Sequence, residues 1–394
     1  MLVMAPQFTI RGEMILDHPK ILFVIDGLEF GGGERGFLQL AAGLGDRFDI
    51  LVASSPGGQF EDKIRKLEIR FYPIHLGKRV SFKPILQIRD LIVSHDIDLL
   101  HSQGARADFF SRIAGRLAGF PCILCTVQMP VEGFDIGPIW KIIYRFMDRV
   151  SERYVERFIV VSKPLKQLMI EKRGIPDQKV ARIYNGIELG EYMPNGKEVI
   201  SQKSEVRKEF GLSKDALVIG AIGRIVWQKG FEYLIEAVPQ IANSIPEARF
   251  LIVGEGPLRK ELVALSRDLG ATEEVIFTGF RSDIRDILAS VDLLVVPSLL
   301  EGFPMITLEA MAMEKPIVAT NIDGITEQIT NEENGILVPP RDPAALANAI
   351  IRLLSDRKSA QRMGIAARKM VEQEFSVERM VSETEKVYLS LLKG

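Results

Sequence analysis

The sequence predicts an α/β protein with two doubly wound domains, each built on a parallel sheet. Three observations carry this prediction: the length, a regular alternation of short apolar runs with amphipathic stretches, and one polar interruption near the middle. At roughly 150 residues per domain, 394 residues allow two large domains or three small ones. A content of 47% hydrophobic and 26% charged residues is typical of a globular chain and excludes a disordered one.

The first half of the chain has the pattern of one such domain. A strand inside a parallel sheet is covered on both faces, so it reads as a continuous apolar run, and helical stretches separate these runs. We therefore predict a parallel sheet with helices on both faces. Its strands are expected at residues 21–25, 50–53, 71–74, 99–101, 122–127 and 158–161.

A polar stretch that contains Pro194 and Gly196 interrupts the pattern, which then restarts. The strands of the second half are expected at residues 217–222, 249–253, 275–277, 293–296, 316–319 and 336–338. We place the domain boundary near residue 195. The predicted organisation is a loosely ordered leader, a first domain, a second domain and an amphipathic C-terminal helix, at residues 1–19, 20–195, 196–375 and 376–394.

Charge and hydropathy exclude several classes of partner. Fifty basic and 52 acidic side chains leave a net charge of −2, so the chain has no basic footprint for nucleic acid. No apolar run reaches the ~20 residues of a membrane span, and residues 1–19 lack the apolar segment of a signal peptide. We therefore expect a cytoplasmic protein. Cys122 and Cys125 are read as part of a buried strand, because no second cysteine pair completes a zinc site.

In doubly wound domains, ligands bind at the carboxyl ends of the strands, so motifs directly after strands are informative. Gly-Gly-Gly-Glu-Arg at residues 31–35 follows the first strand and opens a helix. Glycines let a ligand approach the backbone closely, and the amides of a helix N-terminus suit an anion. An ordinary strand-to-helix turn would show the same pattern and is the alternative. Gly254 and Gly256 follow a later strand, and the same two interpretations apply to them.

Two cations follow the first strand of the second domain. Gly223 and Arg224 come directly after the strand, and Lys229 stands five residues later, where the next helix begins. Arginine binds phosphate oxygens in pairs and lysine adds a point charge, so the spacing favours a diphosphate site. Two solvated surface cations are the alternative.

Two acids follow a later strand. Glu301 lies in a glycine turn, and Glu309 lies in the helix that Pro304 opens. Both carboxylates can reach the same cleft, and an acid beside a ribose is a known device of nucleotide sites.

These motifs, together with Asn-Gly-Ile-Glu at residues 185–188, resemble family 4 of the retaining glycosyltransferases in order and rough spacing, over about residues 20–390. The stretch 297–310 is the most specific part. The resemblance implies a GT-B fold, in which two facing Rossmann-like domains border a cleft and a final helix crosses back onto the first domain. It also implies a retaining, metal-independent hexosyltransferase whose co-substrate is a nucleotide diphosphate sugar of the UDP or GDP type, with no other cofactor.

The resemblance also implies roles for individual residues. Arg224 and Lys229 are expected at the diphosphate, Glu309 at the ribose, and Glu301 beside the donor sugar and the reacting centre. The two cations would neutralise the charge that develops on the leaving diphosphate. The other donor-binding residues that it implies are Gly32, Gly33, Gly223, Gly254, Gly302, Phe303 and Met305. Asp96 and Asp98 match a metal motif of other glycosyltransferases only superficially, and no metal site is expected.

The chain departs from the family pattern at one position. Many members carry a histidine after the fifth strand, and this chain has Gln128 there, which cannot act as a cation or a general base. His101, at the end of the preceding strand, is the nearest remaining catalytic candidate. A hydrogen-bonded histidine at a strand end is the alternative.

The acceptor is expected against the first domain. Between Lys63 and Arg116 the chain has eleven basic and five acidic residues. This excess suits a phosphate-bearing acceptor or an anionic membrane surface, although solvated helix faces would give it too. With Gln128, the acceptor-side candidates are Arg79, Lys83 and Arg106.

The stretch 140–157 mixes aromatic and aliphatic residues with cations. We expect this helix to pack on its own sheet, with attachment to the inner face of a membrane as the alternative. The predicted function is sugar transfer to a glycan, lipid-linked or small-molecule hydroxyl, in cell-envelope polysaccharide, lipopolysaccharide or glycolipid synthesis. A nucleotide-sugar epimerase and a noncatalytic nucleotide-sugar-binding module are the alternatives.

Overall fold

The computed structural model describes residues 18–28, 30–76, 81–120, 122–129, 137–193 and 197–393. It contains two parallel sheets. The first has the order β3-β2-β1-β4-β5-β6-β7. Its strands are β1 (Lys20–Ile25), β2 (Asp49–Ser54), β3 (Arg70–Pro73), β4 (Leu99–Gln103), β5 (Ile123–Val127), β6 (Arg157–Val160) and β7 (Val180–Arg182).

The second sheet has the order β10-β9-β8-β11-β12-β13. Its strands are β8 (Leu217–Ile222), β9 (Ala248–Val253), β10 (Val275–Gly279), β11 (Leu293–Val296), β12 (Ile317–Thr320) and β13 (Ile336–Val338). In both sheets the strand order reverses beside the first strand, between β1 and β4 and between β8 and β11. Such switch points leave a crevice at the carboxyl ends of the strands, where ligands bind.

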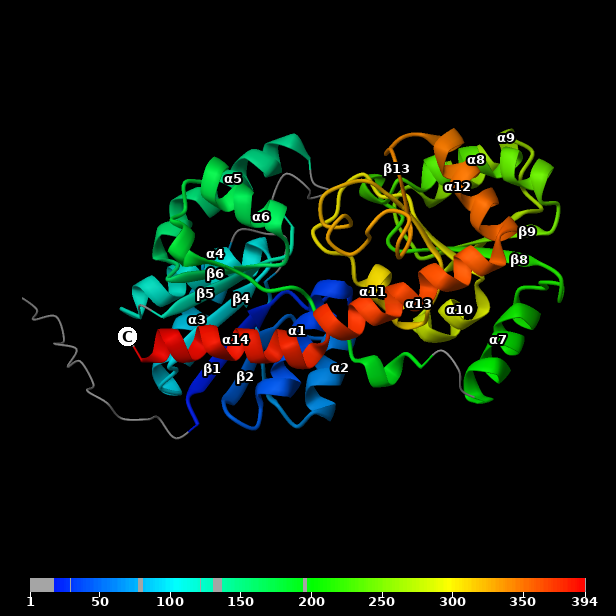
Figure 1. Cartoon of the computed structure of the whole chain (residues 1–394). Helices are drawn as coiled ribbons and strands as arrows, with labels where there is room; N and C mark the ends of the chain where they lie inside the picture. Colours follow the sequence, from blue (N-terminus) through cyan, green and yellow to red (C-terminus); the bar gives the residue numbers. More distant parts are fainter. Residues whose placement is uncertain are drawn as a thin grey trace, which may run out of the picture.

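Helices connect most consecutive strands and cover both sheets, whereas turns join β12 to β13 (Figure 1). In the first domain these are α1 (Gly32–Leu44), α2 (Gln59–Lys66), α3 (Lys83–Ser94), α4 (Ala105–Leu117), α5 (Pro138–Ser151) and α6 (Lys163–Gln167). In the second they are α7 (Lys197–Glu209), α8 (Phe231–Ser244), α9 (Arg259–Asp268), α10 (Ile284–Ser290), α11 (Met305–Ala312), α12 (Pro343–Ser355) and α13 (Arg357–Glu374). The architecture confirms the predicted fold class, two doubly wound α/β domains.

The last helix, α14 (Val377–Leu392), leaves the second domain and lies along α1 of the first (Figure 1). The face of α14 that contacts the first domain is buried, because Met380 and Tyr388 belong to the same apolar cluster as Phe23 and Phe37. Because burial of apolar area is the main favourable term in folding, this helix fastens the end of the chain to its beginning.

Each of the twelve runs expected from the sequence overlaps a strand, and four of them extend one residue beyond it; among the described residues, sequence reasoning missed the short edge strand β7. Three residues that are only partly buried give too little apolar signal. The proposed boundary at residue 195 and most of the proposed leader fall outside the described residues. Of the two cysteines, Cys125 is buried in β5 and Cys122 is half-buried beside it, and both are free thiols. Burial raises the pKa of each to about 12.

Candidate functional site

A cation and a carboxylate meet where β8 and β11 end. Lys229 Nζ lies 2.6 Å from Glu301 Oε1, and Ser298 donates a hydrogen bond of 2.7 Å to the same oxygen. The hydroxyl of Thr320, at the end of β12, donates to the backbone carbonyl of Ser298. Glu301 is only 7% exposed, so its position is set by these bonds before any ligand arrives.

Two glycine turns bring the ends of β8 and β9 against each other. A β-carbon on Gly254 would lie 1.9 Å from the carbonyl oxygen of Gly223, and the φ of Gly254 is +138°. The Lys229 side chain passes over Gly223, and the exposed Arg224 follows directly. The structure therefore brings together five of the residues expected from the sequence: Gly223, Arg224, Lys229, Gly254 and Glu301.

The first domain closes onto this site at two glycines. A β-carbon on Gly302 would lie 1.8 Å from the carbonyl oxygen of Gln128, and one on Gly32 would lie 2.9 Å from Cγ of Met305. Each of these contacts joins one domain to the other, so the domains touch at the start of α11.

The side chain of Phe303 also lies in this contact. It stacks on Tyr184 of the first domain, with ring centroids 4.9 Å apart, and packs edge-on against Phe375. Tyr184 in turn donates a hydrogen bond of 2.5 Å to Glu327 of the second domain. Sequence reasoning named Phe303 for its backbone amide and missed Tyr184 and Glu327, which carry no motif.

Glu309 lies in α11 and is 4% exposed. Its Oε1 forms an ion pair with Arg35 Nη1, from α1 of the first domain. The same Arg35 nitrogen donates a hydrogen bond of 3.0 Å to the hydroxyl of Tyr192, in the segment between the domains. The signal for Arg35 was its place directly after the glycines and Glu34, but nothing in the sequence pairs it with Glu309.

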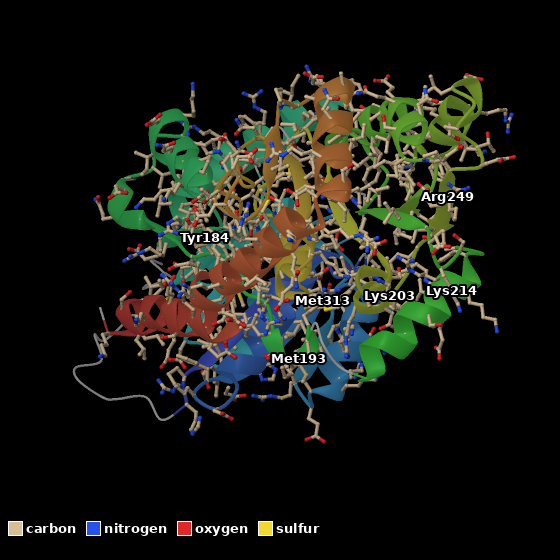
Figure 2. The ribbon with its side chains drawn as sticks, turned by 45° about the vertical axis from the view of Figure 1, so that its right-hand side comes forward. Tyr184, Met193, Lys203, Lys214, Arg249 and Met313 are labelled. Carbon is tan, nitrogen blue, oxygen red and sulfur yellow. The ribbon has the colours of Figure 1, made fainter. Side chains whose placement is uncertain are left out.

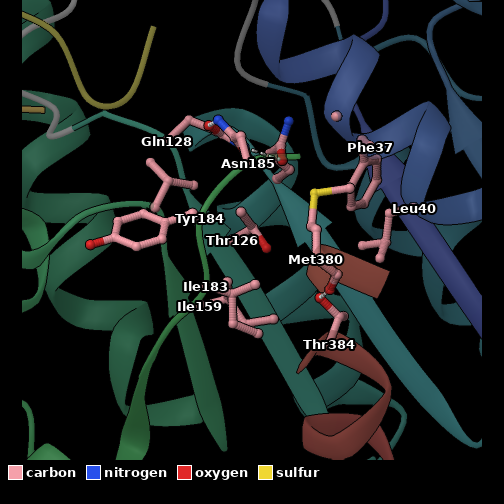
Figure 3. Close-up of a pocket in the computed structure, with 13 residues that line it drawn as sticks. Phe37, Leu40, Thr126, Gln128, Ile159, Ile183, Tyr184, Asn185, Met380 and Thr384 are labelled. Carbon is pink, nitrogen blue, oxygen red and sulfur yellow. Dashed lines mark hydrogen bonds between the residues drawn. The ribbon is translucent and has the colours of Figure 1, made fainter. Parts of the chain in front are cut away.

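Gln128 is held in a chain of amide hydrogen bonds. Its Nε2 donates to Gln103 and Asn185, and Asn185 Nδ2 returns a bond of 2.8 Å to Gln128 Oε1. Gln103 also donates 2.9 Å to the carbonyl oxygen of Gly33. Figure 3 shows Gln128 and Asn185 side by side at the rim of a small pocket that Met380 and Thr384 of α14 also line. The network fixes Gln128 at the mouth of the cleft.

His101 lies away from the cleft, which corrects its candidacy as a catalytic group. It is fully buried in β4, with Nδ1 2.5 Å from the Tyr388 hydroxyl and Nε2 2.7 Å from Thr126 Oγ1. Burial lowers its pKa to about 3. The imidazole ring is enclosed between Phe23, Phe37 and Tyr388 and cannot reach a substrate. His101 is therefore a hydrogen-bonded histidine at a strand end, which was the alternative interpretation.

A cavity of about 180 Å³ opens beside Gln128 at the carboxyl ends of β1, β4 and β5. Asp26, which pairs with Arg106, lies on one side of it. Its lining also includes Asp108, Arg112, Asp148 and Arg173, a set of buried charges that sequence reasoning missed.

Asp108 is the most perturbed acid of this set. Burial raises its pKa to about 6, although Arg112 nearby and a hydrogen bond from Ser102 favour the ionised form. Of the acceptor-side candidates, Gln128 lines the cavity and Arg106 contacts a lining residue. Lys83 is exposed at the first turn of α3 and does not line it, and Arg79 lies outside the described residues.

The expectation that α5 packs its apolar face on the sheet is wrong. Ile139, Ile142 and Phe146 are each about 70% exposed, and Trp140 is 44% exposed. The opposite side of α5 carries Asp148, which faces Arg112 and Arg173 in the cavity. One helix therefore presents an apolar surface outward and borders the cavity inward.

Two kinds of site are absent from the described residues. No three His, Cys, Asp or Glu side chains in these ranges gather as metal ligands. No helix within them has the length and apolar character of a membrane span.

Two family models match the chain: "Glycosyltransferase Family 4" over residues 30–191 and "Glycosyl transferases group 1" over residues 202–370. The UDP-Gal:alpha-D-GlcNAc-diphosphoundecaprenol alpha-1,3-galactosyltransferase of Escherichia coli is 27% identical over 354 residues, 88% of this chain and 90% of that protein. The 2-deoxystreptamine glucosyltransferase of Streptomyces kanamyceticus is 30% identical over 275 residues, 67% of this chain and 69% of that protein.

Among solved structures, Alr3699/HepE of Anabaena in complex with UDP and glucose matches with a TM-score of 0.83. The match covers 95% of this chain and 100% of that one at 24% identity, so it bears on the fold alone. It agrees with the arrangement of two facing domains around a cleft.

Proposed function

Because this chain belongs to glycosyltransferase family 4 and is a glycosyltransferase, we propose that it moves a hexose from a nucleotide diphosphate sugar to a hydroxyl of a lipid-linked glycan. The carrying observation is the cluster of Lys229, Arg224 and Glu301 at two glycine turns, next to the point where Gly302 meets Gln128, a residue that lines the cavity of the first domain. This supports a donor site in the second domain next to an acceptor site in the first.

The donor diphosphate would lie over Gly223 and Gly254. The absence of a β-carbon on Gly254 lets the two glycine turns lie against each other, and Lys229 and Arg224 supply positive charge beside them. As the glycosidic bond breaks, negative charge grows on the leaving diphosphate, and cations already in place stabilise it without further reorganisation. Glu301 keeps Lys229 oriented and lies where the donor sugar would bind.

Retention and metal independence are parts of this proposal. A pair of cations can neutralise a leaving diphosphate, a task that a divalent cation performs in other enzymes. For retention we propose a same-face displacement through an oxocarbenium-like state, in which a donor phosphate oxygen takes the proton of the acceptor hydroxyl. No cofactor besides the nucleotide sugar is required in this scheme, and a UDP or GDP sugar is the expected donor.

The acceptor is proposed to be lipid-linked because of α5. The helix borders the cavity through Asp148 and exposes Ile139, Ile142 and Phe146 on its other side, where Arg145 and Arg149 are also exposed. An apolar face flanked by cations suits the surface of an anionic membrane, where such helices lie in the interface. A cytoplasmic enzyme docked in this way at the inner face would hold its cavity close to a lipid-linked sugar, the kind of acceptor named for the Escherichia coli relative.

The test is a transfer assay with UDP-sugars and GDP-sugars and a diphosphoundecaprenol-linked GlcNAc acceptor. We expect release of the nucleoside diphosphate that depends on the acceptor, an α-linked product from an α-linked donor, and unchanged turnover with EDTA. Conversion of the donor sugar without any acceptor would instead identify an epimerase. Thermal stabilisation by the nucleotide with neither transfer nor hydrolysis would identify a binding module.

A further inference from the structure

We infer that Arg35 is a positioning residue for the ribose of the donor: it reaches across the cleft and holds the Glu309 carboxylate in the orientation that binds the ribose hydroxyls. The inference rests on the proposed function, since it takes Glu309 as the ribose ligand. It adds a residue of the first domain to a subsite that otherwise belongs to the second.

The contacts of Glu309 indicate that one of its carboxylate oxygens binds Arg35 and the other remains for the ribose. Glu309 is 4% exposed as a residue, and Arg35 Nη1 binds its Oε1. A carboxylate has two oxygens with about four lone-pair positions, so a guanidinium on Oε1 leaves Oε2 for the donor. Leaving a buried carboxylate unpaired is costly, so the pair is expected to persist when the nucleotide enters.

Arg35 is itself held in place. Its Nη1 donates to the hydroxyl of Tyr192, which is 5% exposed, and Arg368 of α13 donates a hydrogen bond of 2.6 Å to the Tyr192 carbonyl oxygen. The guanidinium therefore has a fixed partner on the segment between the domains. A ribose that meets an already oriented carboxylate does not have to order it, which preserves binding free energy.

The arrangement also links ribose binding to domain closure. The first turn of α1 contacts α11 twice, through Gly32 against Met305 and through Arg35 against Glu309. Because Arg35 belongs to the first domain and Glu309 to the second, the ion pair forms only when the two domains are together. The ribose subsite is therefore complete only in the closed form, the form in which donor and acceptor also meet.

The test compares the binding of UDP, GDP and ADP with that of their dideoxy forms, which lack both ribose hydroxyls, by calorimetry. In the wild type, we expect the nucleotide that binds to be preferred over its dideoxy form by about tenfold or more, the value of a charged hydrogen bond. Glu309→Gln should abolish this preference. Arg35→Met should remove most of it, and Arg35→Lys should retain part.

The matched control is Arg47→Met, because Arg47 also pairs with an acid of a distant segment, Glu385 of α14, but does not contact Glu309. It should keep the full ribose preference. If Glu309→Gln keeps the preference, or none of the nucleotides binds, the proposed donor site itself is wrong. If Glu309→Gln loses the preference while Arg35→Met keeps it, or if Arg35→Met binds the nucleotide more tightly, the role of Arg35 is overturned and the donor site stands.

Discussion

Single side chains in the cleft are positioned by partners that come from several strands. Lys229 is oriented by Glu301, Glu301 by Ser298, and Ser298 by Thr320. Such a chain keeps the cation in one place, so the charge is available at the moment the diphosphate leaves. The consequence is that a change at Lys229 should affect turnover more than folding.

We expect Lys229→Ala to lower kcat on the order of 10² or more, because one preorganised charge at the developing anion is lost. Steady-state kinetics with the donor found in the transfer assay measures this. Lys203→Ala is the matched control, since Lys203 of α7, labelled in Figure 2, also pairs with an acid of the same domain, Asp292. Near-normal turnover in Lys229→Ala would contradict the site.

His101 should make stability depend on pH. Burial lowers its pKa to about 3, whereas an unfolded chain has a histidine pKa of about 6.5. Between these values the unfolded state binds a proton that the folded state does not, so the free energy of unfolding falls as pH falls, by up to several kcal/mol. We expect the free energy of unfolding, measured with urea at several pH values in this range, to depend less on pH in His101→Gln than in the wild type. If the free energy of unfolding changes equally with pH in His101→Gln and in the wild type, the lowered pKa of His101 is not the cause. His75 is exposed, so His75→Gln is the control and should keep the wild-type pH dependence.

The helices α14 and α5 differ in where their apolar side chains lie. The helix α14 closes the chain on α1 through Tyr388, which is bonded to His101 and packed on Phe48. The large apolar side chains of α5, in contrast, are exposed and face away from the sheet. An apolar stripe that stays exposed beside cations is typical of an interfacial helix.

We expect the protein to sediment with phosphatidylglycerol-containing vesicles at low salt and to stay in the supernatant with phosphatidylcholine alone. The double variant Ile142→Ser/Phe146→Ser should lose this binding, because two of the most exposed apolar side chains of α5 are removed. Phe280→Ser is the matched control, since Phe280 is 58% exposed but lies in the second domain. Equal binding by the α5 variant and the control would exclude α5 as the membrane surface.

The two domains meet through backbone contacts that leave no room for a side chain. Gly302 is the tightest of these points, because a β-carbon there would overlap the Gln128 carbonyl oxygen of the other domain. Misplacing reacting groups by an ångström can cost a large part of the rate. Closure should therefore be sensitive to a single methyl group.

We expect Gly302→Ala to hold the domains apart and to lower kcat/KM on the order of 10²-fold. Small-angle scattering should show a larger radius of gyration than that of the wild type. Gly45→Ala is the control, because the nearest atom to a β-carbon there is 3.6 Å away, an ordinary contact. A Gly302→Ala protein with wild-type dimensions and activity would show that this contact is not needed.

Much of the donor side could be predicted from the residue order. Gly223, Arg224, Lys229, Gly254 and Glu301 each follow a strand, and parallel strands deliver their carboxyl ends to one edge of a sheet. The acceptor side was harder to predict. Asp108 and Arg112 looked like ordinary residues of an amphipathic helix, and only packing shows that they are buried at a cavity.

The amino-acid order alone was enough for the two parallel sheets and for the cations and acids at their ends, because these depend on apolar runs and on turns between neighbours in the chain. Packing decided the rest. Arg35 and Glu309 are 274 positions apart, and His101 and Tyr388 are 287 apart. The periodicity of α5 revealed an apolar face but not what it faces. Such contacts depend on how two domains and a returning helix fit together, and no local pattern of residues encodes that fit.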